Sequence, residues 1–115
     1  MRRMIAFAAA AALVPAVALA HHGWSSYDPN NALTLEGPIK SVKYQNPHGE
    51  IELAHDGKDW LVVLAPPSRM ERRGLPREML EVGKRVTVVG YPSRHDPREM
   101  RAERISVGES TIELR

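Results

Sequence analysis

Histidine is the residue type in this chain with the clearest capacity for chemistry. The sequence contains five histidines and no cysteine, and two of the histidines, His21 and His22, are adjacent. Imidazole nitrogen binds transition metals and titrates near neutral pH. The lack of cysteine excludes disulfides and thiolate metal sites. Any metal site in this chain must therefore be built without cysteine ligands.

Residues 1–20 have the three parts of a secretory signal peptide. Arg2 and Arg3 give a positive start, residues 4–19 form an Ala-rich apolar run, and Ala18-Leu19-Ala20 is a small-x-small cleavage site. The run is short and weakly apolar for a membrane span, which disfavours the alternative of an uncleaved anchor. An Ala-rich leader suits a bacterial exported protein. We expect cleavage of the leader, a periplasmic location and no stable membrane span in the mature chain.

Cleavage after Ala20 would place a free α-amine beside the imidazoles of His21 and His22. That amine titrates at about 7.7–8.0, so a metal can displace its proton at mild pH. The amine and the His21 ring can chelate one ion, and an opposing imidazole would complete a nitrogen-rich tetragonal site, which favours Cu(II). His48, presented by an Asn46-Pro47 turn, is the candidate for that imidazole. Tetrahedral Zn(II) is the alternative metal.

The segment that carries these histidines, residues 21–32, also allows a structural interpretation. It is rich in turn-forming residues and has no periodicity, so we expect an N-terminal arm before the folded domain. Its aromatic residues Trp24 and Tyr27 are candidate ligand-binding residues. The alternative is that HHGWSSYD only seals the domain, with His22 or His48 hydrogen-bonded to the backbone. The other two histidines, His55 and His95, are expected to be solvated.

Charge and length limit what the mature chain can do. Arg2 and Arg3 are the only charged residues of the leader, so the 16 basic and 14 acidic residues of the whole chain become 14 of each, and the net charge falls from +2 to 0. One small domain with balanced charge and few aromatic residues is not expected to bind nucleic acid. The arginines within 69–77 and 94–104 are expected to be solvated faces or a patch for an anionic partner.

Alternation of apolar and polar residues predicts a β-rich domain over residues 33–115. Residues 33–44 change parity after Ile39, which predicts a long first strand with a bulge, and Gly37-Pro38 predicts a sharp bend. Asp56-Gly57 is the favoured two-residue hairpin turn. This turn pairs Leu53 with Trp60 and Ile51 with Val62 on one buried face. Leu61 and Val63 fall on the opposite face, where the Trp24-bearing arm is a candidate cover.

A short helical segment is predicted between the third and fourth strands. Ser68 followed by Glu71 has the spacing of a capping box, and Gly74 is a natural helix stop. Pro76 then fits a first helical position. The remaining strands are predicted at 84–91 and 99–107, with 111–114 as an extension of the sheet. This β-β-β-α-β-β order predicts an all-β, five-stranded OB-like barrel; a β-sandwich is the alternative, for which the chain is short.

The segment HHGWSSYDPNNALTLEGPIKSVKYQNPHGEI, with the later LEVGKRVTVVGYPSR, resembles a family of short exported bacterial proteins of unknown function. The marks of the resemblance are the HHGWSSYD start, Asn46-Pro47-His48 and the strand around Trp60. The resemblance covers nearly the whole mature chain. It implies export and an OB-like barrel, and it brings no established activity.

These observations favour a binding protein over an enzyme. The sequence has no nucleophile elbow, phosphate-binding glycine loop or paired-carboxylate spacing, so we expect no catalysis. The leading hypothesis is a periplasmic barrel that binds a transition metal, copper before zinc, through His21, His22 and His48. The alternative is a non-catalytic envelope module that binds a protein or small ligand through the barrel face.

Overall fold

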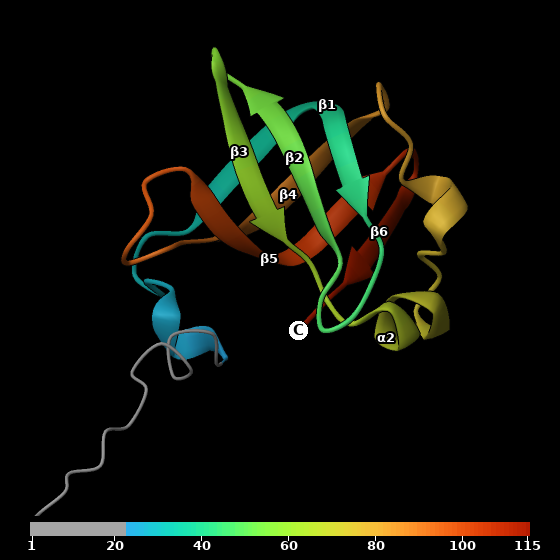
Figure 1. The fold of residues 1–115 in the computed structure, drawn as a ribbon, viewed down its shortest axis with the longest axis horizontal. Helices are drawn as coiled ribbons and strands as arrows, with labels where there is room; N and C mark the ends of the chain where they lie inside the picture. Colours follow the sequence, from blue (N-terminus) through green and yellow to red (C-terminus); the bar gives the residue numbers. More distant parts are fainter. Residues whose placement is uncertain (1–22) are drawn as a thin grey trace, which may run out of the picture.

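A computed structural model describes residues 23–115, and the predicted strands occur in the predicted order (Figure 1). They form one sheet in the order β3-β2-β1-β4-β5-β6, and a parallel pairing of β3 with β5 closes the first five strands into a barrel. The predicted all-β, OB-like barrel is therefore confirmed. The strands are β1 (Leu33–Lys43), β2 (Glu50–His55), β3 (Lys58–Val63), β4 (Arg85–Pro92), β5 (Glu99–Val107) and β6 (Ser110–Glu113).

The bent first strand joins the two halves of the barrel. Its first half, residues 33–38, pairs with β4, and its second half pairs with β2 after a register shift between Ile39 and Ser41. The predicted bulge is thus present. Gly37 lies near the end of the half that pairs with β4, where it pairs with Val86, and a Cβ there would collide with the carbonyl group of Ala54 in β2. Glycine is needed at this position because the neighbouring backbone approaches so closely.

The β2–β3 hairpin has the predicted register. Leu53 pairs with Trp60, and Ile51 pairs with Val62. The two turn residues, Asp56 and Gly57, have φ of 53° and 75°, as expected for the turn type that matches the twist of the flanking strands.

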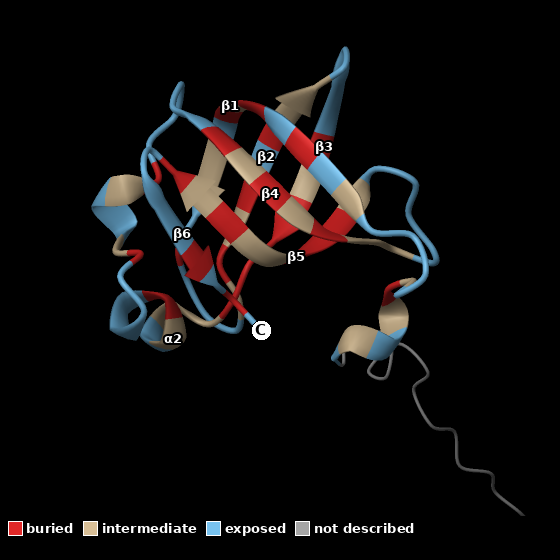
Figure 2. Ribbon diagram, turned by 180° about the vertical axis from the view of Figure 1, so that it is seen from behind, coloured by how far each residue is buried: buried red, intermediate tan, exposed pale blue. Residues whose placement is uncertain are grey.

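Apolar side chains from every strand fill the barrel, and the buried positions alternate with exposed ones along β1 and β2 (Figure 2). Burial of these side chains is the main source of the domain's stability. The largest fully buried side chains are Ile39, Ile51, Leu53, Leu64, Met70, Leu75, Met100, Ile105 and Leu114.

The connection between β3 and β4 holds two short helices, α2 (Pro67–Arg72) and the 3₁₀ turn η2 (Arg77–Met79). The predicted capping box at Ser68 is wrong, because Pro66 is the N-cap and no side chain caps the helix. Pro67 starts the helix instead, since its fixed φ and missing N–H suit the first helical position. Pro76, predicted at a first helical position, is instead the N-cap of η2, so that turn begins one residue later, at Arg77.

The N-terminal arm packs along the barrel beside the β4–β5 connection (Figure 1). It begins with the 3₁₀ turn η1 (Trp24–Ser26). Tyr27 forms an antiparallel bridge with Ser93, and the Asp28 amide donates to the Pro92 carbonyl at 2.9 Å. Tyr27 is buried. Within residues 23–115, no helix has the length and apolar character needed to cross a bilayer.

Candidate functional site

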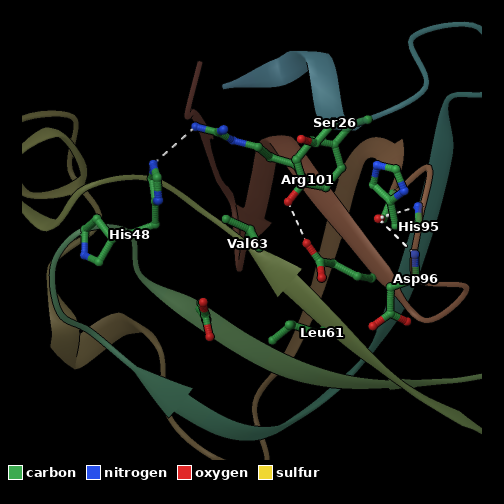
Figure 3. Close-up of a pocket in the computed structure, with 12 residues that line it drawn as sticks. Ser26, His48, Leu61, Val63, His95, Asp96 and Arg101 are labelled. Carbon is green, nitrogen blue, oxygen red and sulfur yellow. Dashed lines mark hydrogen bonds between the residues drawn. The ribbon is translucent and has the colours of Figure 1, made fainter. Parts of the chain in front are cut away.

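A pocket of about 660 Å³ lies between the arm, the β1–β2 loop and the β4–β5 loop, over strands β3 and β5 (Figure 3). OB-folds bind their ligands on this side of the barrel, between the same two loops. The lining residues are Ser26, Tyr27, Pro47, His48, Glu50, Leu61, Val63, Ser93, His95, Asp96, Glu99 and Arg101.

The parallel pairing of β3 with β5 determines which side chains share the pocket. Leu61 pairs with Glu99, and Val63 pairs with Arg101. Two apolar side chains of β3 are therefore placed beside two charged side chains of β5. The sequence correctly placed Leu61 and Val63 on the face opposite the core, and the arm residues that line the pocket with them are Ser26 and Tyr27.

The Tyr27 side chain fastens the arm to the barrel. Its hydroxyl donates a 2.6 Å hydrogen bond to Oε2 of Glu99. Burial, followed by the contact with the Glu99 carboxylate, raises the pKa of Tyr27 far above its ordinary value. The phenol therefore stays protonated and neutral. Its hydroxyl proton is engaged with the Glu99 carboxylate.

His48 lies at one side of the pocket, next to the guanidinium of Arg101 (Figure 3). Nη2 of Arg101 lies 3.4 Å from Nε2 of His48. Burial first, and then the charges of Arg101 and Arg69, lower the pKa of His48 below its ordinary value. The imidazole is therefore neutral at pH 7, and its Nε2 accepts from the guanidinium.

Arg101 is buried, so the expectation that the arginines within 94–104 form a solvated face is wrong for this residue. Its exposed fraction is 7%, and it is the only charged residue in the buried class among residues 23–115. The arm covers the side of β5 that would otherwise face solvent. The alternation of polar and apolar residues along β5 cannot reveal that the arm covers Arg101, because the arm is far away in sequence.

Trp24 packs on Arg101 from the arm. The Trp24 ring centroid lies 4.4 Å from Cζ of Arg101 and 4.5 Å from Cζ of Arg115. Contacts at these distances between a guanidinium and an indole face are attractive. The ring also makes edge contacts with Tyr27 and Tyr91. Trp24 thus lies outside the main pocket and borders a smaller hollow of about 250 Å³ with Tyr27 and Tyr91.

The predicted site residues have different outcomes. His21 and His22 lie outside the described residues, so their approach to His48 stays a prediction. His48 and Tyr27 line the same pocket. Within residues 23–115 there is no group of three or more His, Asp or Glu side chains placed to hold a metal ion.

The other two histidines differ from each other. His95 is exposed, as expected, and lines the pocket on the side opposite His48 (Figure 3). His55 is half-buried, so the expectation that it is solvated is wrong. Its Nδ1 lies 2.9 Å from the carbonyl oxygen of Glu36. Arg101 and Glu99 are the pocket residues that sequence reasoning missed as site residues.

The fold and this pocket define a small OB-like β-barrel with a ligand-sized hollow between two of its loops and its arm. A family model described as a family of unknown function (DUF6152) matches residues 9–101. The chain therefore belongs to this family, which confirms the resemblance to a family of unknown function. No curated protein matches the chain.

Solved structures share the fold at low sequence identity. One is the ZRD-deleted mutant of TiaS in complex with agmatine, with a TM-score of 0.55 and 15% identity over 76% of this chain and 27% of that one. Another is a complex of TiaS with a tRNA and ATP, with a TM-score of 0.53 and 16% identity over 77% of this chain and 20% of that one. The chain thus spans about a quarter of the length of these structures or less, and the likeness shows the fold alone.

Proposed function

We propose that this protein is an exported, non-catalytic binding module that holds a small ligand in the pocket between the arm and the two loops. The observation that carries this proposal is the pocket itself. It lies at the usual ligand side of an OB-fold, and it places apolar walls from Leu61 and Val63 beside a larger set of polar and charged side chains. Polar groups that converge on a hollow beside apolar walls are a feature of ligand sites. Export rests on the leader sequence of residues 1–20.

Two pairs of polar side chains in the pocket favour binding over catalysis, because the members of each pair are engaged with each other. Tyr27 donates to Glu99, and Arg101 contacts His48. A general base must be free to take a proton from a substrate. The raised pKa of Tyr27 makes it a poor acid, and the acceptor nitrogen of His48 already faces a guanidinium. These pairs suit groups that hold a ligand in one orientation.

Filling the pocket tests this proposal. A panel of small neutral, cationic and anionic fragments is titrated into ¹⁵N-labelled mature protein, and the expected result is saturable amide shifts grouped at Ser26, Leu61 and Val63. Leu61→Trp should remove these shifts by occupying the space. Val82→Trp, which adds the same side chain at a position 68% exposed, should leave them unchanged. Shifts that are scattered over the barrel, or that survive Leu61→Trp, would contradict the pocket proposal.

Copper binding is a second candidate, and the position of Trp24 favours it. Trp24 contacts Arg101, and Arg101 contacts His48, so a single guanidinium separates the arm from His48. His21 is three residues before Trp24, and three residues of chain span at most about 10 Å. A mature N-terminus at His21 would thus be within reach of His48. The lowered pKa of His48 also supports a metal, because no proton must be displaced from a neutral ring.

The copper candidate has to accommodate Arg101. An ion bound to Nε2 of His48 would lie close to the guanidinium, and two positive charges repel each other. Copper binding therefore requires the Arg101 side chain to turn away from His48. Loss of the Arg101 charge should therefore strengthen copper binding.

A further inference from the structure

The guanidinium of Arg101 is the most unusual feature of the pocket. It is 7% exposed, and no carboxylate of residues 23–115 forms an ion pair with it. Its Nε is buried and has no hydrogen-bond partner among residues 23–115. The contacts that it does make, to the neutral His48 ring and the Trp24 face, do not balance its charge.

Other arginines reinforce the positive charge at this point. Burial, and then the nearby charges of Arg69 and Arg115, lower the pKa of Arg101, although an arginine remains protonated in any case. A buried charge without a partner is unfavourable in a folded protein. Apolar residues of similar volume would be more favourable here, so the presence of arginine indicates a role other than stability.

Neighbouring groups hold the guanidinium in a defined plane. The Trp24 ring packs against it at 4.4 Å, and His48 accepts from Nη2 at 3.4 Å. A planar fork of N–H donors matches the two oxygens of a carboxylate or a phosphate. The buried, unpartnered Nε is one donor of that fork, and Arg101 lines the hollow that a ligand would enter.

We propose that Arg101 is the anchor for an oxyanion group, a carboxylate or a phosphate, on the ligand of this pocket. This inference rests on the proposed function and names its ligand class. The oxyanion replaces the missing counter-ion of Arg101. The rest of the ligand lies along Leu61 and Val63 toward Asp96, which occupies the side of the pocket opposite His48 (Figure 3). Asp96 adds a negative charge there, so the ligand presents a neutral or cationic group at that end.

Titration with simple anions tests the anchor. Sodium acetate and inorganic phosphate are added separately at constant ionic strength, and chloride serves as the ionic control. The expected result is a saturable shift of the Arg101 Nε–H and Trp24 indole N–H signals. If acetate binds more tightly than phosphate, the oxyanion group of the ligand is a carboxylate. If phosphate binds more tightly, that group is a phosphate. No saturable shift with either anion would overturn the proposal.

Variants of arginine separate the anchor from a general charge effect. Arg101→Met should reduce anion affinity at least tenfold while the unfolding midpoint stays equal or rises. Arg104→Met is the matched control on the same strand, because Arg104 is paired with Glu103 and Glu113, and it should leave anion binding unchanged. If Arg101→Met does not fold, Arg101→Lys is tested in its place. Weaker anion binding by folded Arg101→Lys supports the oxyanion anchor, and anion affinity equal to that of the wild type overturns it.

The same variants distinguish this inference from the pocket proposal. Fragments that bind Arg101→Met as tightly as wild type, and are displaced by Leu61→Trp, would leave the pocket standing and overturn the oxyanion anchor. Anions that bind at Arg101 even in Leu61→Trp would leave the anchor standing and contradict the pocket proposal.

Discussion

The two tryptophans represent two regions that are built by different physical rules. Trp60 lies in the barrel, 9% exposed, in the cluster that includes Leu53 and Val62. Trp24 lies on the arm, half-buried, and packs on the guanidinium groups of Arg101 and Arg115. The barrel region is held by apolar burial. The arm region is held by cation–π contacts, by backbone hydrogen bonds to the β4–β5 connection, and by the short side-chain hydrogen bond from Tyr27 to Glu99.

This difference shows where the molecule tolerates unfavourable groups. In the barrel, the Nε1 of Trp60 is buried and has no hydrogen-bond partner in the described part of the chain. That neutral donor is a small penalty beside a large apolar gain. The arm and pocket instead contain the buried charge of Arg101, which has no counter-ion among residues 23–115. We therefore expect the function to lie in the arm and pocket, because the unfavourable burial of the Arg101 charge there is not offset by a gain in stability.

The largest effect is expected in the barrel. Trp60→Ala should lower the free energy of unfolding by about 3–5 kcal/mol, because it opens a large cavity in a small domain. Trp60→Phe is the matched control: it keeps most of the volume and removes the unpartnered N–H, so its loss should be clearly smaller. Urea denaturation measures both. Equal midpoints for Trp60→Ala and wild type would show that the barrel is not held by this cluster.

The next effect concerns copper and the chain terminus. If His21 is the mature N-terminus and binds Cu(II), an additional Met before it should weaken binding about a hundredfold, or about 2.7 kcal/mol, because the amine becomes an amide. Competition with a chelator of known strength measures the affinity. His48→Ala should weaken binding further, and Arg101→Met should strengthen it by removing a repelling charge. Equal affinity with and without the extra Met would exclude the terminal chelate.

A smaller effect is expected on the arm. Trp24→Ala should lower the free energy of unfolding by about 1–2 kcal/mol, because it removes the partly exposed cation–π contacts with two arginines and the edge contacts with two tyrosine rings. Proteolysis of the arm should accelerate more than global unfolding, because the barrel stays intact. A loss as large as that of Trp60→Ala would show that the arm belongs to the same cooperative core.

The smallest effect is a dependence on pH. Burial and the arginine charges lower the pKa of His48 in the folded state, so between that value and the unfolded value of about 6.5 the unfolded chain binds more protons. Stability of the metal-free protein should therefore fall as pH drops through this window. His48→Gln should flatten the slope, whereas His95→Gln, at an exposed position, should not. A slope unchanged by His48→Gln would contradict the assignment.

Local sequence signals identified most of the barrel. The Asp56-Gly57 turn fixed the hairpin register, and the parity change after Ile39 marked the bulge, as the strand pairings confirm. Both signals depend on neighbours within a few residues. The helix start was placed wrongly, because two starting signals overlap at Pro67 and Ser68 and the proline takes the first position.

The sequence by itself determined the strands and their order along the chain, because side-chain alternation and turn chemistry act over short distances, and that order predicted the OB-like barrel. The parallel pairing of β3 with β5 that closes the barrel joins residues far apart in sequence. The sequence also singled out His48 and Tyr27, which share the pocket. Only the tertiary structure decided that Arg101 is buried, because its cover comes from Trp24 and the arm. When a distant segment buries one side of a strand, the polar–apolar alternation of that strand does not change. Arg101 therefore looks like a solvated surface residue in the sequence, although it is the central charge of the candidate site.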